Sequence, residues 1–333
     1  MFERLDNLLA GLLDRSYEQA TRQTLRAVTS NLTSGVVAQR LDELDAEAAR
    51  LAAAGQRLTP GNPVLRALLA DLDPVLTRAA NRADGAATDV QAAGQSAARD
   101  LTRQLAIGGI DDATLAALGI TWNTPDPEAI AALVDYVSSD AFAAEVGRIA
   151  PRALDQVQNI ATRGLVNGWG PLRIARAVRA SVEGFTPAQI NNLLRTLQLS
   201  SYRRATAAHQ NANRDILTEI VRVAVLDQRT CFACIALHGE RLPVGTVIQD
   251  HHQGRCTSVA LVRGRPRNIL TGPEWFDQLS PAQQQNLAAA QRSPGKLEAL
   301  RAGRATLQDF VQPYTDDIFG QMIREGALRD AIR

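Results

Sequence analysis

The sequence is poor in cysteine and has no long hydrophobic run. Only three cysteines occur in 333 residues, which argues against the disulfide framework of a small secreted domain. No stretch approaches the roughly 18 consecutive apolar residues that a membrane span requires. The opening MFERLDNLLAGLLDR places acidic residues among its leucines, unlike a signal or transit peptide. We therefore expect a soluble protein made in a reducing cytoplasm.

Aromatic residues and lysine are also scarce. Aromatics make up 4% of the chain, and of the 36 basic residues one is lysine, Lys296, and 35 are arginine. The abundant residues are strong helix formers, so we expect a mainly α-helical protein. Hydrophobic residues at 45% and charged residues at 21% argue against disorder of the bulk. The net charge of +1 offers no strong overall attraction to nucleic acid, anionic lipid or acidic substrates.

The spacing of apolar residues suggests three regions along the chain. Residues 1–150 are predicted to form a helical N-terminal region, in which the sequence LTPGNP at 58–63 separates two helices. Residues 151–265 are predicted to be helical with a small inserted β unit. Residues 266–333 are predicted to form a C-terminal tail of short helices.

Two local patterns refine this outline. Apolar and other residues alternate over 220–226 and again over 257–264, which is typical of strands. Thr186 with Gln189, and Ser280 with Gln283, have the spacing of capping boxes at helix starts.

The potential metal ligands lie between and beside the two predicted strands. Cys231 and Cys234 form a C-x2-C turn, and His251 and Cys256 follow. Such a turn aims both sulfurs at one point, and a later His and Cys can complete the tetrahedral Cys3His set of a structural zinc site. That set is closed, so it leaves no position for a reactive water. We therefore predict a structural zinc ion held by these four residues.

Other interpretations of the same residues stay open. A thioredoxin-type redox pair requires its C-x-x-C at the start of a helix in a parallel α/β setting, and a disulfide is disfavoured by the compartment. Unliganded thiols in a small core are a further alternative. The choice between His251 and the adjacent His252 as a ligand is also open. His238 is expected in a turn or at the surface, and His209 as a solvated or core histidine on a helix.

The stretch LDQRTCFACIALHGERLP, with HHQGRCTSVALV after it, resembles the signature of the Mu F-like minor head proteins of tailed phages, the phage head morphogenesis family. Two positions depart from the family pattern: His252 stands where proline is usual, and Gly254 stands where the first cysteine of a Cys-Arg-Cys would be. The matching positions are Asp227, Arg229, Thr230, Cys231, Cys234, Leu237, Gly239, His251, Arg255 and Cys256.

The resemblance extends over roughly 150–312. GLVNGWGPLRIARAVR is similar to a glycine-rich turn and helix of the family, and LLRTLQLSSYRRATAAHQN to a helix in which Leu197 replaces the usual acid. The stretch from EWFDQLSPAQQQ to TLQDFV is similar to the family's tail. The first 150 residues match only in being helical.

The resemblance implies a virion protein, present in few copies at the portal vertex or the inner capsid surface and in the host cytoplasm during assembly. Its implied partners are the portal protein or the major capsid protein, with packaged DNA as a further possibility. It implies a structural role in head morphogenesis rather than an enzyme, and no membrane or small-molecule substrate.

Two other functions are weighed against this one. A metal-dependent nuclease could use the pair His251 and His252, and a toxin-type enzyme is known as a fusion to this family; either would need an open metal position or further carboxylates. A nucleic-acid-binding adaptor could use a basic patch. Its arginines would be Arg263, Arg265 and Arg267, with Arg222 and Arg241 nearby.

Overall fold

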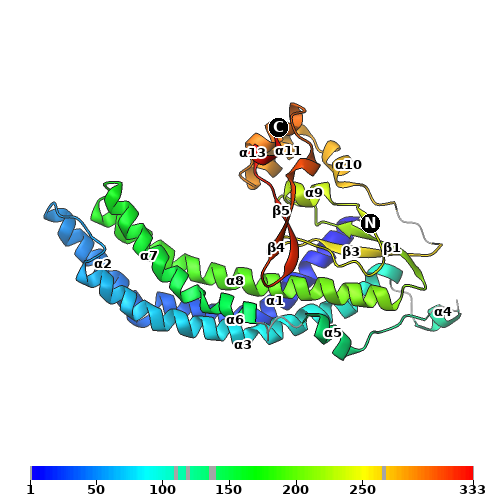
Figure 1. Cartoon of the computed structure of the whole chain (residues 1–333), viewed down its shortest axis with the longest axis horizontal. Coiled ribbons are helices and arrows are strands. Elements are labelled where there is room, and N and C mark those ends of the chain that lie inside the picture. The colour runs from blue at the N-terminus through cyan, green and yellow to red at the C-terminus, as the bar shows by residue number, and fades with distance from the viewer. Residues whose placement is uncertain (1, 109–111, 118–120, 135–139, 265–267, 333) are drawn as a thin grey trace. The chain divides into compact units, whose positions relative to one another are not determined.

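The computed structural model describes residues 2–108, 112–117, 121–134, 140–264 and 268–332, and it is mainly helical with a few short strands, as the sequence predicted (Figure 1). The helices of the first two thirds are α1 (Phe2–Thr33), α2 (Gly35–Ala53), α3 (Pro63–Ile107), α4 (Asp112–Ala117), α5 (Pro127–Val134), α6 (Asp140–Gly147), α7 (Ile149–Val166) and α8 (Pro171–Ala212). Those of the last third are α9 (Phe232–Ala236), α10 (Gly272–Asp277), α11 (Pro281–Ala290), α12 (Pro294–Arg301), the 3-10 helix η1 (Leu307–Phe310) and α13 (Leu328–Ala331). The strands are β1 (Leu217–Val223), β2 (Arg241–Leu242), β3 (Thr257–Val262), β4 (Val311–Asp316) and β5 (Gly320–Glu325).

The chain forms two compact units that interleave in sequence. Helices α1, α3 and α8 each contribute residues to both units. Unit 1 consists of Met1–Tyr17, Gln91–Tyr136 and Thr196–Arg333, and unit 2 of Glu18–Val90 and Val137–Arg195.

Unit 2 is entirely helical within the described residues. Its core is built from small and branched apolar side chains, among them Leu41, Leu44 and Leu68, which are almost fully buried. Ion pairs join its helices: Arg40 Nε of α2 lies 2.6 Å from Asp71 Oδ2 of α3.

Unit 1 contains an antiparallel sheet with the strand order β2-β1-β3. The central strand pairs Ile220 with Leu242 on one side and Val221 with Val259 on the other. Strand β3 lies where the alternating pattern predicted it, whereas β1 begins and ends three residues before the predicted range 220–226. The cysteine-containing segment connects the two strands.

The two faces of this sheet pack against different partners, because side chains alternate along a strand. Val223 and Val259 face a cluster that includes Leu101 of α3 and Tyr202 of α8. Ile220 and Ala260 belong to a second cluster, which also contains Ile248, Cys234 and Cys256. The candidate ligands thus lie on the face of the sheet that points away from α8's Tyr202.

A third apolar cluster joins the short helices of the last third. Phe232 of α9 is completely buried and packs edge-on against Phe276, with ring centroids 6.0 Å apart, and against Phe310 at 5.9 Å. This cluster anchors the helix that carries the two cysteines of the C-x2-C turn.

The predicted helical tail is wrong for residues 311–325, which form the antiparallel hairpin β4–β5. Pro313 has no backbone N–H to donate within a helix. The Asp316 carboxylate accepts hydrogen bonds from the backbone N–H groups of Ile318 and Phe319, and Gly320 adopts a φ of +76°. The Asp316 hydrogen bonds and the conformation of Gly320 form a tight turn, which the helical prediction from apolar spacing did not include.

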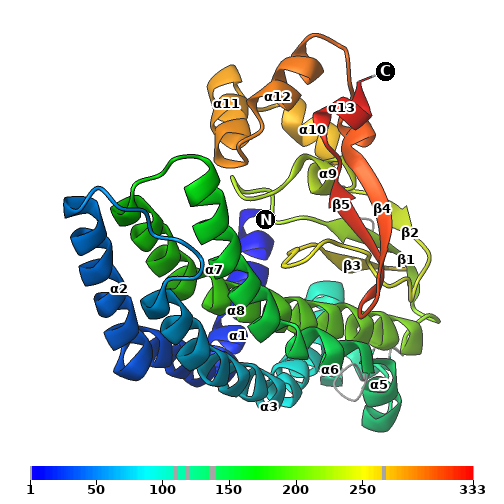
Figure 2. The ribbon, with the colours of Figure 1, turned by 60° about the vertical axis from the view of Figure 1, so that its left-hand side comes forward.

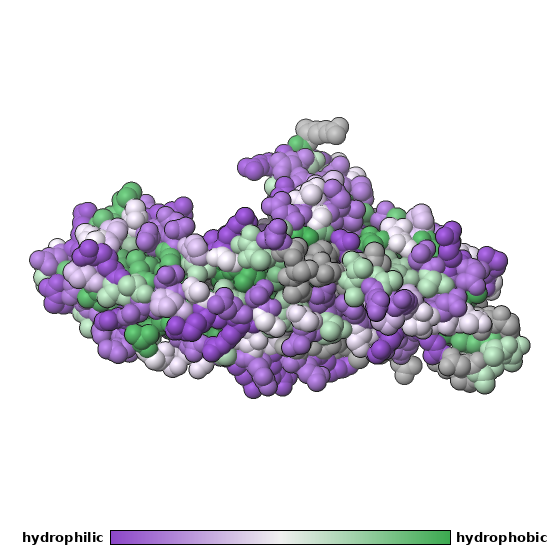
Figure 3. Space-filling view, turned by 60° about the horizontal axis from the view of Figure 1, so that its bottom comes forward, coloured by the Kyte–Doolittle hydropathy of each residue, from purple (hydrophilic) through white to green (hydrophobic). Residues whose placement is uncertain are grey.

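The two predicted capping boxes have different outcomes. At Ser280 the box is present: its hydroxyl accepts from the N–H of Gln283, whose side chain accepts from the N–H of Ser280. At 186 no new helix starts, because α8 continues through Pro187. Among the described residues, no helix combines the length and apolar character needed to cross a membrane. On the face shown in Figure 3, hydrophobic residues form scattered patches among hydrophilic ones.

Candidate metal centre

Cys231 and Cys234 are positioned by the start of α9. Cys231 is the N-cap residue of this helix, with an extended backbone, and its sulfur accepts a hydrogen bond from the N–H of Cys234 at 3.4 Å. A thiolate or thiol thus occupies the place that a Ser or Asp side chain usually takes at a helix start. Because the cap turns the chain back on itself, both sulfurs point to the same side.

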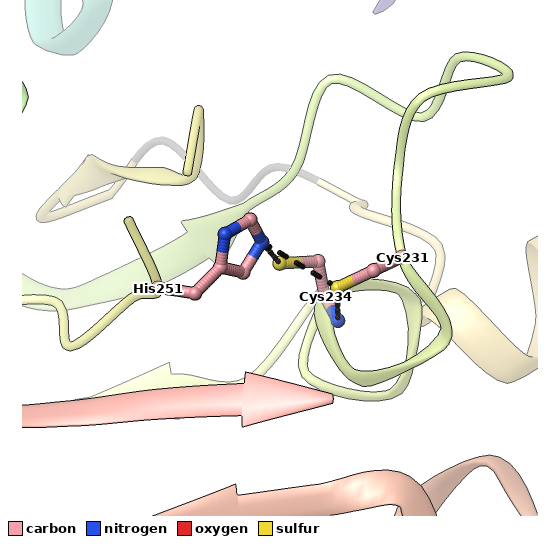
Figure 4. A group of neighbouring side chains, drawn as sticks. All are labelled: Cys231, Cys234 and His251. Atoms are coloured by element: carbon pink, nitrogen blue, oxygen red, sulfur yellow. Dashed lines mark hydrogen bonds between the residues drawn. The ribbon is translucent and has the colours of Figure 1, made fainter. Parts of the chain in front are cut away.

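His251 completes a group of three ligand atoms (Figure 4). Its Nε2 lies 3.5 Å from the Cys231 sulfur and 3.4 Å from the Cys234 sulfur. A tetrahedral zinc ion with usual bond lengths separates an imidazole nitrogen from a thiolate sulfur by roughly 3.6 Å. The observed separations fit that value, so the three residues could hold a metal ion.

Cys256 lies close to Cys234, in a second group of possible ligands that does not include Cys231 or His251. The sulfurs of Cys234 and Cys256 and a carboxylate oxygen of Asp250 all lie within 4.8 Å of one another. Cys234 therefore belongs to both groups of possible ligands, and the five side chains form one cluster. Cys234 and Cys256 are buried, whereas Cys231 and His251 are half-buried.

Asp250 is the centre of a buried hydrogen-bond network. Its carboxylate accepts hydrogen bonds at 2.9 Å from the backbone N–H groups of His251 and Cys256. It also accepts one at 2.9 Å from Nη2 of Arg203 on α8, and Nη2 of Arg222 on β1 lies 3.8 Å away. One carboxylate therefore fixes the backbone of two ligand residues.

Two buried arginines surround this carboxylate. Arg203 also donates from Nε to the carbonyl oxygen of Cys256 at 2.8 Å and from Nη2 to the carbonyl oxygen of Gly254. Arg222 is 2% exposed, and its charge interacts with Cys256, Asp250 and Cys234. Buried cations of this kind require negative charge nearby.

The electrostatics of the cluster follow from these contacts. Burial alone would raise the pKa of Asp250, but Arg203, His251 and Arg222 lower it to about 2. The hydrogen bond with Cys234 lowers the pKa of Cys231 to about 6, and the His251 ring adds to this effect. The same contact raises the pKa of Cys234 well above its usual range. Burial opposes the charge on His251, yet Cys231 and Asp250 raise its pKa to about 10.

The position of the Asp250 side chain requires a glycine at position 254. A Cβ atom at Gly254 would overlap the Asp250 carboxylate. This is the position where the resembling family has the first cysteine of its Cys-Arg-Cys. In this chain the Asp250 carboxylate fills the space that a side chain at 254 would need.

The other three histidines lie outside this group of ligands. His252 turns away from the metal group: its Nε2 lies 3.2 Å from Asp316 Oδ2, and its ring packs edge-on against Phe319. His251 is therefore the histidine that faces the cysteines. His238 lies in a turn, as expected, but it is buried rather than at the surface, and its Nδ1 accepts a hydrogen bond from the N–H of Ala224 at 2.9 Å. His209 is a buried core histidine.

The predicted basic patch on the β unit is not assembled by the described residues. Arg222 is buried beside Asp250, and Arg241 forms an ion pair with Glu219. Arg263 is exposed. Arg265 and Arg267 lie outside the described residues.

The other residues of the signature shape the chain around the cluster. Arg255 forms a two-pronged ion pair with Asp227, at 2.7 and 2.5 Å. Asp227 also accepts from the N–H of Arg229 and the hydroxyl of Thr230, which fixes the turn before α9. Gly239 adopts a φ of +87° and packs closely against the backbone of Thr271.

No protein family, curated protein or solved structure compared with this chain matches it.

Sequence reasoning identified the four candidate ligands but overlooked the network that holds them. No role was assigned to Asp250 from the sequence, and Arg222 was considered only as part of a basic patch. Arg203 lies 47 residues before Asp250, and no local spacing connects them. An acid directly before the ligand histidine was the one available signal, since metal-bound histidines commonly have a carboxylate nearby.

Proposed function

We propose that this chain is a structural minor head protein of a tailed phage, of the Mu F-like type, acting in head morphogenesis at the portal or inner capsid surface of the virion. The observation that carries the proposal is the convergence of the signature residues on one cluster. Cys231, Cys234 and His251 face one another, Cys256 adjoins Cys234, and Asp227 with Arg255 braces the turn that leads to them. A signature most of whose members serve one local structure supports a common fold better than scattered matches would.

Zinc is the proposed ion, with Cys231, Cys234, His251 and Cys256 as its ligands. Three sulfurs and one imidazole are the donors that zinc prefers in structural sites. Asp250 is the competing fourth ligand, but its oxygens already accept from Arg203 and from two backbone N–H groups. When bound, such an ion supplies folding free energy by cross-linking the segments that hold its ligands.

Charge balance in the buried cluster supports the same assignment. Three thiolates and the Asp250 carboxylate carry four negative charges, and a zinc ion with Arg203 and Arg222 carries four positive ones. With no ion at neutral pH, the Cys231 thiolate and the Asp250 carboxylate would face two buried guanidinium groups and the protonated His251 ring, which leaves one positive charge unbalanced. Since uncompensated buried charge is costly, the neutral arrangement is favoured.

The role of the site in this proposal is structural. Four protein ligands leave no position at which an ion could activate water. Asp250, with its pKa lowered to about 2 and its oxygens hydrogen-bonded, is a poor general base at neutral pH. The cluster instead fastens α9 to the start of β3, next to the sheet.

Mass spectrometry of purified phage particles tests the head-protein proposal. The particles would come from the phage whose genome encodes this chain, and intact heads would be separated from tails before proteolysis. We expect peptides of this chain in the head fraction at a small fraction of the abundance of the major capsid protein. Absence of the chain from heads that contain portal protein would contradict the proposal, whatever metal the chain binds.

A further inference from the structure

One end of unit 2 contains arginine and no acidic residue. The segments 48–70 and 156–182 together include seven arginines but no Asp or Glu. In the whole chain, 36 basic residues are balanced by 35 acidic ones. Positive charge is therefore concentrated here although the protein is nearly neutral.

These two segments lie at the same end of unit 2. The first includes the connection between α2 and α3, and the second the connection between α7 and α8 (Figures 1 and 2). Arg179 of α8 donates to Asp45 of α2 at 2.7 Å. Each of these two residues is eight positions from the end of its helix, which is about 12 Å at 1.5 Å per residue. The ion pair therefore places the two connections at the same end of unit 2.

Five of the seven arginines are exposed and form no ion pair among the described residues of the chain. Arg50 and Arg179 are the exceptions, because they pair with Glu47 and with Asp42 and Asp45. We call the other five the basic end: Arg57, Arg66, Arg163, Arg173 and Arg176.

Arg163, Arg173 and Arg176 flank the turn between α7 and α8, and the backbone of this turn is well packed. Trp169 donates its backbone N–H to the carbonyl oxygen of Gly164 at 2.8 Å, and Gly168 adopts a φ of +68°. A Cβ at Gly164 would press against Ile174, so the two helices approach closely there. The Arg173 guanidinium lies 4.1 Å from the centre of the Trp169 ring, which orients it at the surface.

We propose that the basic end binds the phosphate backbone of nucleic acid without sequence preference. A nucleic acid presents negative charge alone along its backbone, whereas protein interfaces usually mix both signs. Guanidinium groups suit phosphate because they donate in a planar fork. Val166 and Leu172 are exposed within the same end, at 80% and 47%, but single exposed apolar residues are common on protein surfaces. The proposal concerns unit 2 and does not depend on the head-protein assignment.

Fluorescence anisotropy of the full chain with a labelled random-sequence duplex of about 30 base pairs tests this proposal. If five arginines contact phosphates, the logarithm of the association constant is expected to fall with the logarithm of the salt concentration with a slope of roughly −4 to −5. The affinity then falls several-hundredfold between about 50 and 200 mM salt. Replacement of all five arginines by Gln is expected to weaken binding at least about tenfold at low salt and to bring the slope close to zero. Arg173→Gln alone is expected to reduce the slope by about one.

The matched control replaces five exposed arginines of unit 1 by Gln, with helix content checked by circular dichroism in every variant. It is expected to bind like the wild type. These arginines are Arg214, Arg263, Arg292, Arg304 and Arg329.

Three results would overturn the proposal. The first is the absence of binding at low salt, and the second is an equal loss of affinity in the unit 1 control. The third is competition by poly-glutamate that equals competition by unlabelled duplex at matched charge, because the surface would then favour an acidic protein partner.

Discussion

At the scale of single residues, Asp250 determines how the ligands of the candidate metal centre are held. It accepts hydrogen bonds from the backbone of His251 and Cys256 and forms an ion pair with Arg203. Asp250→Asn keeps the size of the side chain but removes the charge and one acceptor. We expect metal affinity to fall roughly 10- to 100-fold, as is typical when a group that orients ligands is replaced. Competition with a chromophoric chelator measures the affinity.

The matched control is Asp277→Asn, an exposed acid on α10. It is expected to leave metal affinity unchanged. If Asp250→Asn also bound metal with wild-type affinity, the carboxylate would have no part in organising the site.

His238 gives a pH-dependent contribution to stability. Burial lowers its pKa from 6.5 to about 4, while its Nδ1 accepts from the N–H of Ala224. Because the pKa in the folded state is below that of the unfolded chain, the neutral ring stabilises the fold above pH 6.5. This contribution is lost as the pH falls from 6.5 towards 4, by on the order of 1–2 kcal/mol at pH 5.

His238→Asn supplies an uncharged acceptor in place of the ring. Urea unfolding at pH 7 and pH 5 is expected to show a smaller loss of stability in the variant than in the wild type. Both proteins keep every candidate metal ligand. Any loss of metal at pH 5 is therefore expected to lower the stability of both by the same amount. Equal losses of stability in the two proteins would mean that the pKa of His238 is the same in the folded and the unfolded chain.

At the scale of elements, the short helix α9 is held by close packing against the start of α10. Gly272 donates its N–H to the carbonyl oxygen of His238 at 2.8 Å, and a Cβ at this position would overlap the carbonyl oxygen of Ile235. Gly272→Ala therefore requires a backbone shift and is expected to destabilise the chain by about 1–3 kcal/mol. Chemical denaturation measures the change.

Gly85→Ala is the matched control, because a Cβ at this helical position meets nothing within 4 Å. There the substitution is expected to be neutral or stabilising by up to about 1 kcal/mol. Gly272→Ala with wild-type stability would show that α9 and α10 can separate without cost.

The elements also show what could be predicted from the sequence. Strand β3 lies at its alternating segment and β1 overlaps the first half of the other one. Many helices begin or end near glycine or proline because those residues act locally, although α3 and α8 continue through a proline. The hairpin β4–β5 was missed, since its turn depends on the Asp316 side chain and Gly320 within a stretch whose apolar spacing also suits a helix. The network around Asp250 was missed because Arg203 and Arg222 reach it only after α8 and β1 have packed together.

At the scale of the whole molecule, the metal centre belongs to unit 1 alone. Removing the ion with a strong chelator should therefore loosen the segments around it and spare the helices of unit 2, because a bound metal stabilises only the structure that forms its site. Hydrogen exchange is expected to accelerate over 231–262. Peptides from 37–53 of α2 are expected to keep their protection. Unchanged exchange over 231–262 after complete removal of the metal would contradict a structural role.

The central claim is that Cys231, Cys234, His251 and Cys256 hold one structural zinc ion. Elemental mass spectrometry of the purified, untagged chain tests it most directly, beside Cys256→Ser and the control Cys256→His, whose imidazole is a usual zinc ligand. The account predicts one zinc per chain, loss of most of it in Cys256→Ser and partial retention in Cys256→His. A wild-type chain without zinc, or full zinc content in Cys256→Ser, would contradict the four-ligand site.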